Sequence, residues 1–361
     1  MCSSNVKLRV GILFGGKSAE HEISLQSAKN VYDAIDRNRF DPVLIGIEKT
    51  GKWRLAGDSV SPLNRGAAVA LIPESEGVLC QTCRESPRNS GADNLKLDVV
   101  FPILHGPFGE DGTVQGLLKL AGVPFVGSGV LGSAVGMDKD VMKRLFRDAG
   151  IPIGKFLAFR SHEPPPPFAE TEAALGNPVF VKPANMGSSV GISKAHNAAE
   201  FSAAVKEAFW YDTKIIAEEY IRGREIECAV LGNETPAASV LGEIIPRHEF
   251  YSYDAKYLDE NGAALEIPAK IDSENAKRIQ ALAVKAFQVL GCEGLARVDF
   301  FLRENGEALI NEINTMPGFT KISMYPKLWE TCGIGYTELI TRLITFALER
   351  FEKERGVRTS R

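Results

Sequence analysis

The stretch "ARVDFFLRENGEALINEINTMPG", residues 296–318, has the pattern of two β-strands joined at an Asn-Gly pair, and it places charged groups on a face that should be buried. Asn-Gly is the strongest short signal for a two-residue hairpin loop, because type I′ turns need positive φ at both central positions. Counting outward from this loop pairs Asp299 with Glu312 and Arg297 with Asn314. Since side chains repeat every second residue, all four are predicted to project from one face.

Two carboxylates that face each other across a strand pair repel, so this arrangement costs stability unless they share a proton or hold a cation. Asn314 adds a third hard oxygen, and such a donor set suits magnesium. The alternative is a solvated hairpin face on which Arg297 is the local counter-ion. The flanking sequence is too apolar for a wet edge, which favours a metal site formed by Asp299, Glu312 and Asn314.

The 361-residue chain has a mixed composition and a formal net charge of −4, which suits a globular protein of two or three domains. Its basic residues are dispersed, which argues against a nucleic-acid partner. No apolar run reaches about 18 residues and no signal peptide is recognisable, so no membrane partner and a cytoplasmic location are expected. Six scattered cysteines fit free thiols. Cys80 and Cys83 form a single C-x-x-C, which favours a chance pair in a polar loop over a redox or zinc site.

The first third of the chain predicts an open parallel α/β sheet that ends near Gly127. An apolar strand at 7–16 is followed by an amphipathic helix and a second strand, which is a βαβ opening. A buried parallel strand is expected at 97–104, then a glycine-rich loop that leads into a helix, and another strand at 123–128. Residues 57–95 are polar and rich in Gly, Ser and Pro, and we expect a poorly structured insertion there.

The remainder predicts a mixture of helices and strands. A helix with an apolar side containing Met142 and Phe146 begins the second region, and the prolines within 163–168 indicate a surface connection. Four strands are expected between 178 and 233. The C-terminal helix repeats apolar residues at i, i+3 and i+4 spacing, which is typical of a packing surface rather than a ligand site.

Two glycine-rich segments are candidates for phosphate binding. "GSGVLG" at 127–132 matches the dinucleotide pattern G-x-G-x-x-G, but it lies outside the first βαβ unit and lacks the acidic residue at the end of the next strand, so we interpret its glycines as turn and packing residues. "VKPANMGSSVGI" at 181–192 is either a flexible hairpin or a loop whose N–H groups and hydroxyls close over phosphate. Lys182 favours phosphate, because an ammonium in an apolar strand needs an anionic partner. Lys139 is a second candidate cation.

The segment "EEYIRGREIE" supplies four carboxylates, Glu218, Glu219, Glu225 and Glu227. Strand alternation lets the last two share one face. Some of the four are expected to be solvated, and an adenine amino group or a ribose hydroxyl would be a suitable partner for one or two.

An ordered set of motifs covers nearly the whole chain: "FGGKSAEHEISL", "HGPFGEDG", "MDK", "FVKPANMGSSVGI", "EEYIRGREIECAV", "YDAKY", "RVDFFL" and "NEINTMPGFTKISMYP". Each motif alone is modest, but the set resembles the D-alanine:D-alanine ligases of the ATP-grasp superfamily. The resemblance implies a three-domain α/β fold: an N-terminal open parallel sheet that binds substrate (1–127), a central lid domain (128–218) and a catalytic domain (219–361). The last two, both α+β, would enclose ATP.

By motif position the resemblance also assigns the site. Eight residues resemble nucleotide ligands: Lys139, Lys182, Ser188, Glu218, Glu219, Ile221, Glu225 and Lys256. Asp299, Glu312 and Asn314 resemble ligands of two Mg²⁺ ions, with Mn²⁺ as an alternative. Six residues resemble substrate ligands: Glu20, His105, Arg297, Gly318, Ser323 and Met324. Five carry catalytic roles in the family: Glu20, Ser188, Tyr257, Arg297 and the Gly318 N–H.

The implied reaction joins two D-alanines with ATP through an acylphosphate, for peptidoglycan precursor synthesis, and the resemblance implies a homodimer. Phe108 and Lys321 depart from the family pattern, but neither position is one of the assigned ligands. One rival is a sister ligase that makes D-alanyl-D-lactate, which Tyr257 argues against. Another is a non-catalytic ATP-binding module, which would have no use for Arg297. A third rival is a nicotinamide oxidoreductase, which would have to bind its dinucleotide at the weak glycine match at 127–132.

Overall fold

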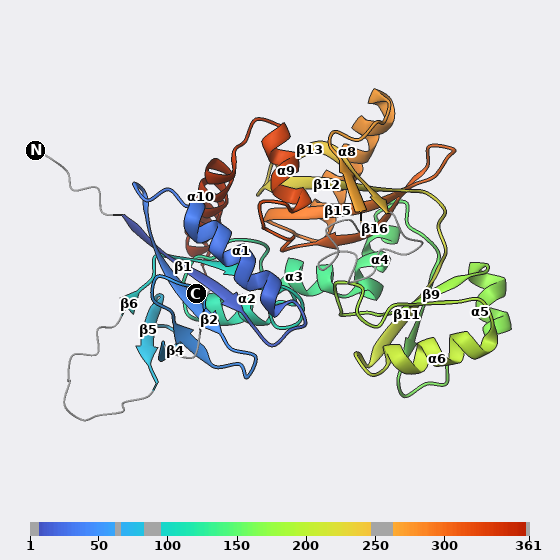
Figure 1. Cartoon of the computed structure of the whole chain (residues 1–361), viewed down its shortest axis with the longest axis horizontal. Helices are drawn as coiled ribbons and strands as arrows, with labels where there is room; N and C mark the ends of the chain where they lie inside the picture. Colours follow the sequence, from blue (N-terminus) through green and yellow to red (C-terminus); the bar gives the residue numbers. More distant parts are fainter. Residues whose placement is uncertain (1–6, 62–65, 83–94, 247–262, 359–361) are drawn as a thin grey trace, which may run out of the picture.

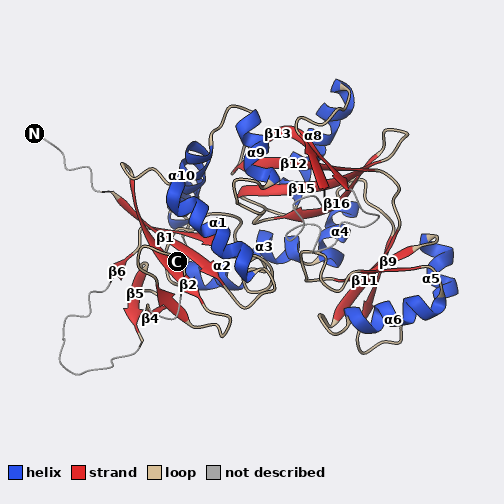
Figure 2. Ribbon diagram, viewed as in Figure 1, coloured by secondary structure: helices blue, strands red, loops and turns tan. Residues whose placement is uncertain are grey.

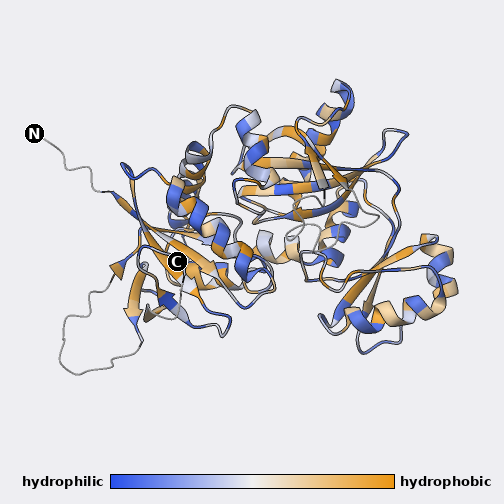
Figure 3. Ribbon diagram, in the orientation of Figure 1, coloured by the Kyte–Doolittle hydropathy of each residue, from blue (hydrophilic) through white to orange (hydrophobic). Residues whose placement is uncertain are grey.

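The computed structural model describes residues 7–61, 66–82, 95–246 and 263–358, and these ranges form three β-sheets and nine helices (Figures 1 and 2). No helix among them is long and apolar enough to cross a membrane. The predicted α/β class is confirmed. Figure 3 shows why the strands form a core: the central strands of the first sheet are coloured mainly as hydrophobic.

The N-terminal sheet has seven strands in the order β6-β5-β4-β3-β2-β1-β7. As predicted, β1 is parallel to both β2 and β7, whereas the remaining pairs are antiparallel. Its strands are β1 (Leu8–Gly15), β2 (Phe40–Ile47), β3 (Trp53–Leu55), β4 (Ala67–Leu71), β5 (Val78–Gln81), β6 (Leu95–Lys96) and β7 (Val99–Ile103). The helices that follow in this region are α1 (His21–Ala34) and α2 (Thr113–Leu120).

Two expectations for this region are wrong. The described parts of 57–95 contain β4, β5 and the start of β6, because Val69, Leu71 and Leu79 are buried and give an otherwise polar segment an apolar face. Residues 123–128 form no strand; their only ladder contact within the described chain is a bridge between Val100 and Phe125. Proline at position 124 lacks the N–H that a longer ladder would need.

The second sheet has four antiparallel strands in the order β10-β9-β11-β8. It consists of β8 (Phe156–Arg160), β9 (Val179–Pro183), β10 (Ser193–Ala195) and β11 (Lys214–Glu219), with α5 (Phe168–Leu175) and α6 (Ala198–Ala208) on one face. Val181 and Ala217 point into the core under these helices. Because strand side chains alternate, Lys182 and Glu218 point to the opposite face.

The third sheet has five antiparallel strands in the order β14-β13-β12-β15-β16. Its strands are β12 (Arg224–Gly232), β13 (Ala237–Pro246), β14 (Ala263–Glu266), β15 (Gly294–Leu302) and β16 (Ala308–Asn314). The helices around it are α3 (Val130–Met137), α4 (Lys139–Asp148), α8 (Ser273–Val289), α9 (Met324–Thr331) and α10 (Tyr336–Arg355). Met142 and Phe146 of α4 pack with Phe287 of α8 and Phe300 of β15 in one core.

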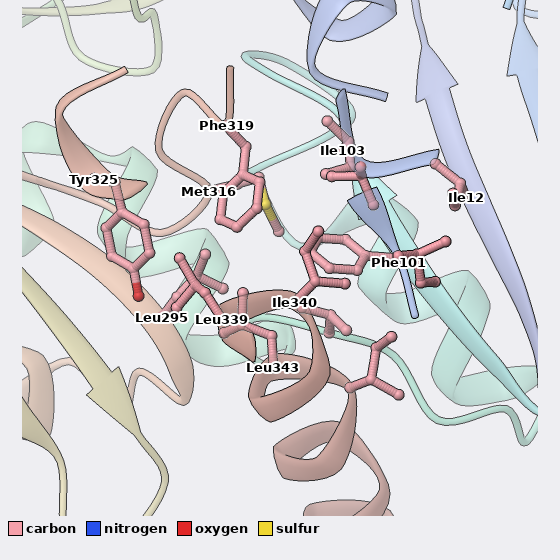
Figure 4. Close-up of a cluster of buried hydrophobic side chains, with 14 of the residues drawn as sticks. Ile12, Phe101, Ile103, Leu295, Met316, Phe319, Tyr325, Leu339, Ile340 and Leu343 are labelled. Atoms are coloured by element: carbon pink, nitrogen blue, oxygen red, sulfur yellow. The ribbon is translucent and has the colours of Figure 1, made fainter. Parts of the chain in front are cut away.

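A single apolar cluster joins the first and third sheets. Leu339, Ile340 and Leu343 of α10 lie between Phe101 of β7 and Leu295 of β15, as Figure 4 shows. The C-terminal stripe is therefore a packing surface, as predicted. The shared core fixes the two sheets relative to each other, and the loops that end their strands are held close together.

The hairpin of β15 and β16 has the predicted pairing, but its loop differs from the predicted one. Gly306 (φ +85°) donates its N–H to Arg303 O, and the loop contains three residues between Arg303 and Glu307 instead of two. This is the common type I turn followed by a left-handed residue. A bulge after Asp299 then shifts the register by one. The two deviations cancel, so Asp299 still pairs with Glu312, and the pairing of Arg297 with Asn314 also stands.

Candidate functional site

Charged side chains gather on one face of β12, β15 and β16. The Arg297 guanidinium donates to both carboxylate oxygens of Asp299 at 2.7 Å, and its Nε lies 3.0 Å from Glu227 on the neighbouring strand. Asn314 donates its side-chain N–H to Asp299 at 3.0 Å. Burial alone would lower the pKa of Arg297, but Asp299 and Glu227 raise it well above its ordinary value. The face is a compact ionic network rather than a solvated edge.

The donor set of this face fits a hard divalent cation in part. Asp299, Glu312 and Asn314 lie on adjacent strands and supply carboxylate and amide oxygens, which are the donors that Mg²⁺ prefers. Asp299 is engaged by Arg297 and Asn314, and no group of three or more acidic, histidine or cysteine side chains in the described ranges is already arranged as a metal site. A metal would therefore share Asp299 with Arg297.

A second ionic cluster lies on the second sheet. Glu218 accepts from Lys182 at 2.5 Å and from Lys143 of α4 at 2.6 Å, and all three side chains are buried or nearly so. Burial alone would raise the pKa of Glu218, but the two lysines lower it from 4.5 to about 2. Burial would likewise lower the pKa of Lys182, yet Glu218 raises it. The anionic partner expected for Lys182 is thus present within the protein.

This cluster predicts a pH-dependent stability. Because the folded-state pKa of Glu218 is depressed, the ion pairs stabilise the fold fully above about pH 4.5, and their contribution is lost as the pH falls toward 2. We expect Glu218→Gln to lower the free energy of unfolding by about 3 kcal/mol at neutral pH, with a difference that shrinks below pH 4.5. Urea unfolding at a series of pH values measures this difference. The exposed Glu307, paired with Arg303, is the matched control, because surface pairs contribute about 1 kcal/mol or less. A difference that stays constant down to acid pH would contradict the prediction.

Lys139 connects the second and third sheets through its side chain. The side chain of Asp138 caps α4 by accepting from the Val141 N–H, which places Lys139 at the first position of the helix. Its ammonium donates to Met186 O at 2.7 Å and lies 3.5 Å from Glu312. A pocket between the loop after β9 and the end of β16 is lined by Lys139, Gly187 and Glu312 among others. The predicted cation therefore lies between the phosphate-loop candidate and the metal candidate.

The loop after β9 also contacts the first sheet. Ser188, which adopts a positive φ of 52°, donates its hydroxyl to Glu20, 168 residues earlier in the chain. Positive φ is costly for serine, and such conformations concentrate at functional loops. Gly106 (φ +74°) lies so close to Glu20 that an added Cβ would be 2.9 Å from its Oε2. Glu20 thus lies between the loop after β9 and the loop that contains Gly106.

His105 and Glu110 of the glycine-rich loop reach the segment that follows β16. The His105 ring donates from Nδ1 to Met316 O at 3.1 Å, and burial lowers its pKa although Glu20 opposes this. Glu110 accepts from the N–H of Gly106 at 2.6 Å and from that of Met316 at 3.3 Å. Burial, followed by the charge of Glu20, raises the pKa of Glu110 to about 8.

The remaining substrate candidates lie around the start of α9. Ser323 is the N-cap residue of this helix, and its hydroxyl lies 2.8 Å from that of Thr320 and close to Gly318. The side chain of Met324 is buried in the shared core, so only its backbone N–H could serve a ligand. The first N–H groups of a helix are well suited to a carboxylate.

Within the described ranges, the other nucleotide candidates do not line the pocket around Lys139. Glu219 accepts from the Lys155 N–H at 2.7 Å and pairs with Arg303, and Ile221 packs against Gly154. Glu225 lies on β12, two residues from Glu227, and contributes to the charge around Lys182. Lys256 and Tyr257 lie outside the residues that the structure describes, as does Cys83. Cys80 is half-buried as a free thiol.

The sequence did not indicate Lys143 or Glu110 as site residues, and it indicated Glu227 only as one of four carboxylates that could contact a nucleotide. Lys143 could have been found, because it follows Lys139 by four positions and therefore shares its helix face. Glu227 is two residues beyond Glu225 on one strand, and its pairing with Asp299 depends on strand order. Glu110 gave no local signal, since its partner Met316 is 206 residues away.

Two protein-family models match the chain. One, described as "D-ala D-ala ligase N-terminus", matches residues 9–128, and the other, "D-ala D-ala ligase C-terminus", matches residues 145–345. The chain is 55% identical to the D-alanine–D-alanine ligase of Shouchella clausii (strain KSM-K16), over 98% of each protein. It is 54% identical to the D-alanine–D-alanine ligase A of Escherichia coli (strain K12), over 98% of this chain and 99% of that protein.

Solved structures are similar over nearly the full length as well. A D-alanine-D-alanine ligase from Coxiella burnetii superposes with a TM-score of 0.86 at 38% identity, covering 97% of this chain and 96% of the other. The D-Ala:D-Ser ligase VanG of Enterococcus faecalis superposes with a TM-score of 0.84 at 37% identity, covering 94% of this chain and 99% of the other.

Proposed function

The chain belongs to the D-alanine–D-alanine ligase family, and we propose that the clusters described above divide the work of its reaction between them. The protein has an ATP-grasp fold and is an ATP-dependent ligase that joins two D-alanines for peptidoglycan precursor synthesis. The assignment of the site rests mainly on Lys139, because its ammonium contacts both the loop after β9 and the hairpin carboxylate Glu312.

The reaction has two proposed steps. A carboxylate oxygen of the first D-alanine takes the γ-phosphoryl group of ATP, so that an acylphosphate forms and ADP leaves. The amine of the second D-alanine, after loss of a proton, attacks the acyl carbon, and the bond to phosphate breaks. The products are D-alanyl-D-alanine, ADP and phosphate. Each step develops negative charge, which positioned cations and N–H donors stabilise.

In the first step, we propose that the cations around the pocket stabilise the phosphoryl group during its transfer. Lys139 and Lys182 neutralise the transferring group, and Ser188 lies in the loop that would cover it. When bound, two Mg²⁺ ions, or Mn²⁺ in their place, would neutralise charge on the phosphates, held by Asp299, Glu312 and Asn314. Glu218, Glu219, Ile221, Glu225 and Lys256 are proposed as further nucleotide ligands.

For substrate binding and the second step, Glu20 is proposed to hold the ammonium of the first D-alanine, with His105 and Tyr257 nearby. Arg297 and the Gly318 N–H would stabilise the tetrahedral oxyanion. The Ser323 hydroxyl and the Met324 N–H, at the N-terminus of α9, would bind the carboxylate of the second D-alanine.

The organisation of the chain remains part of the proposal. We assign three domains, 1–127, 128–218 and 219–361, which contain the three sheets in turn except that β11 ends at Glu219. A homodimer and a cytoplasmic location, where ATP is available, complete it.

Phosphate release from ATP tests the proposed function. The purified protein is assayed with Mg²⁺ and D-alanine, D-serine or D-lactate, and the products are identified by mass spectrometry. We expect one phosphate per D-alanyl-D-alanine, and D-alanine as the preferred second substrate. Preference for D-lactate or D-serine, or phosphate release without dipeptide, would contradict the substrate assignment.

A further inference from the structure

The backbone of Met316 is held at both its N–H and its carbonyl by one loop of the N-terminal region. Its carbonyl accepts from His105 at 3.1 Å, and its N–H donates to Glu110 at 3.3 Å. Its side chain is buried in the core shared by the first and third sheets (Figure 4), and its Cε lies 3.0 Å from where a Cβ on Gly127 would be. Met316 is thus held through its N–H, its carbonyl and its side chain by residues of the N-terminal region.

Met316 lies two residues before Gly318. Pro317 stands between them, and its ring fixes one of the backbone dihedrals in the connection. The position of the Gly318 N–H therefore follows closely from that of Met316. On the other side, only Thr315 separates Met316 from Asn314, the last residue of β16, which pairs with Arg297. The two proposed oxyanion donors are thus related through this short segment.

Glu110 is suited to this task by its two oxygens. One accepts from Met316 and the other from Gly106 at 2.6 Å, so the side chain ties its own loop to the segment after β16. The two N–H groups both meet oxygens of Glu110, whereas a glutamine amide would present its NH₂ to one of them. Glu110 also lines the pocket beside Lys139 and Glu312.

We propose that Glu110 is a positioning residue for the second chemical step: by holding Met316, together with His105, it sets the Gly318 N–H against the oxyanion that forms when the amine attacks the acylphosphate. This role rests on the proposed function. It predicts that loss of Glu110 slows amine attack and leaves phosphoryl transfer to the first D-alanine nearly unchanged.

The two steps can be measured separately. Formation and reversal of the acylphosphate scramble a β,γ-bridging oxygen-18 of ATP in a manner that requires D-alanine, whereas dipeptide formation reports the whole reaction. For Glu110→Gln and Glu110→Ala we expect dipeptide formation to fall by about 10-fold to 100-fold, because small misplacements of a donor cost that much. The scrambling rate should stay within about twofold of wild type, so the ratio of scrambling to turnover rises.

Asp111→Asn is the matched control. Asp111 lies in the same loop and accepts from the N–H groups of Phe108 and Thr113, but it does not contact Met316. The ratio should stay at the wild-type value in this variant. A parallel fall of scrambling and turnover in the Glu110 variants would overturn the inference. Glu110→Gln preserves the shape of the side chain, so it remains informative if Glu110→Ala unfolds. An unchanged turnover in Glu110→Gln would also overturn the inference. Absence of scrambling in the wild type would instead count against the proposed acylphosphate, which is a separate outcome.

Discussion

Replacing Asp299 or Glu312 with alanine should abolish the magnesium-dependent release of phosphate from ATP and D-alanine, with a loss of about 1000-fold or more. Metal ions supply several kcal/mol of transition-state stabilisation in phosphoryl transfer, and each 1.36 kcal/mol is tenfold in rate. The two carboxylates pair across β15 and β16 and constitute most of the proposed ligand set. The phosphate-release assay, repeated over a range of Mg²⁺ concentrations, measures the loss.

The control for these variants is Glu307→Ala, which changes an exposed carboxylate of the same hairpin that pairs only with Arg303 in the described ranges. It should keep wild-type turnover. Asp299→Asn preserves the shape of the side chain and shows whether the fold depends on the charge. Normal turnover in Asp299→Ala or Glu312→Ala would refute the metal assignment.

Replacing Arg297 with methionine should lower kcat by about 100-fold to 1000-fold, which is the typical cost of one lost oxyanion donor. The KM for ATP should change little, because the cations proposed for the nucleotide lie elsewhere, at Lys139 and Lys182. Stability should fall as well, since Glu227 and Asp299 would lose their common cation while remaining buried. Steady-state kinetics and urea unfolding of the same preparation separate the two effects.

Arg297→Lys distinguishes charge from geometry. Lysine keeps the positive charge between Glu227 and Asp299 but lacks the planar fork that contacts both oxygens of Asp299. It should recover most of the stability and little of the rate. A lysine variant with wild-type kcat would show that the guanidinium geometry is not used in the reaction.

The sequence predicted the ionic face of the hairpin correctly, but its reasoning about the turn was incomplete. Asn-Gly favours a two-residue loop, whereas the chain forms a three-residue loop and recovers the register through a bulge after Asp299. Turn chemistry is local, and a bulge depends on how the strand packs against its neighbours. Pairing of Asp299 with Glu312 is therefore set by tertiary packing as much as by the turn.

The missed parts of the fold and the site have a common cause. Composition described 57–95 as an insertion, yet three buried side chains there are enough to add strands to the first sheet. Lys143 and Glu110 act through partners that are distant in sequence. Alternation and spacing show which face a side chain takes, but they do not show which segments meet there. The ordered motifs supplied that information through the family resemblance.

A crystal structure with a non-hydrolysable ATP analogue, Mg²⁺ and D-alanine tests the central claim most directly. We expect nucleotide phosphates between Lys182 of the second sheet and the Asp299 face of the third, with metal ions about 2.0–2.1 Å from oxygens of Asp299, Glu312 and Asn314. Nucleotide bound at another surface, or metal ions held without these three residues, would contradict it.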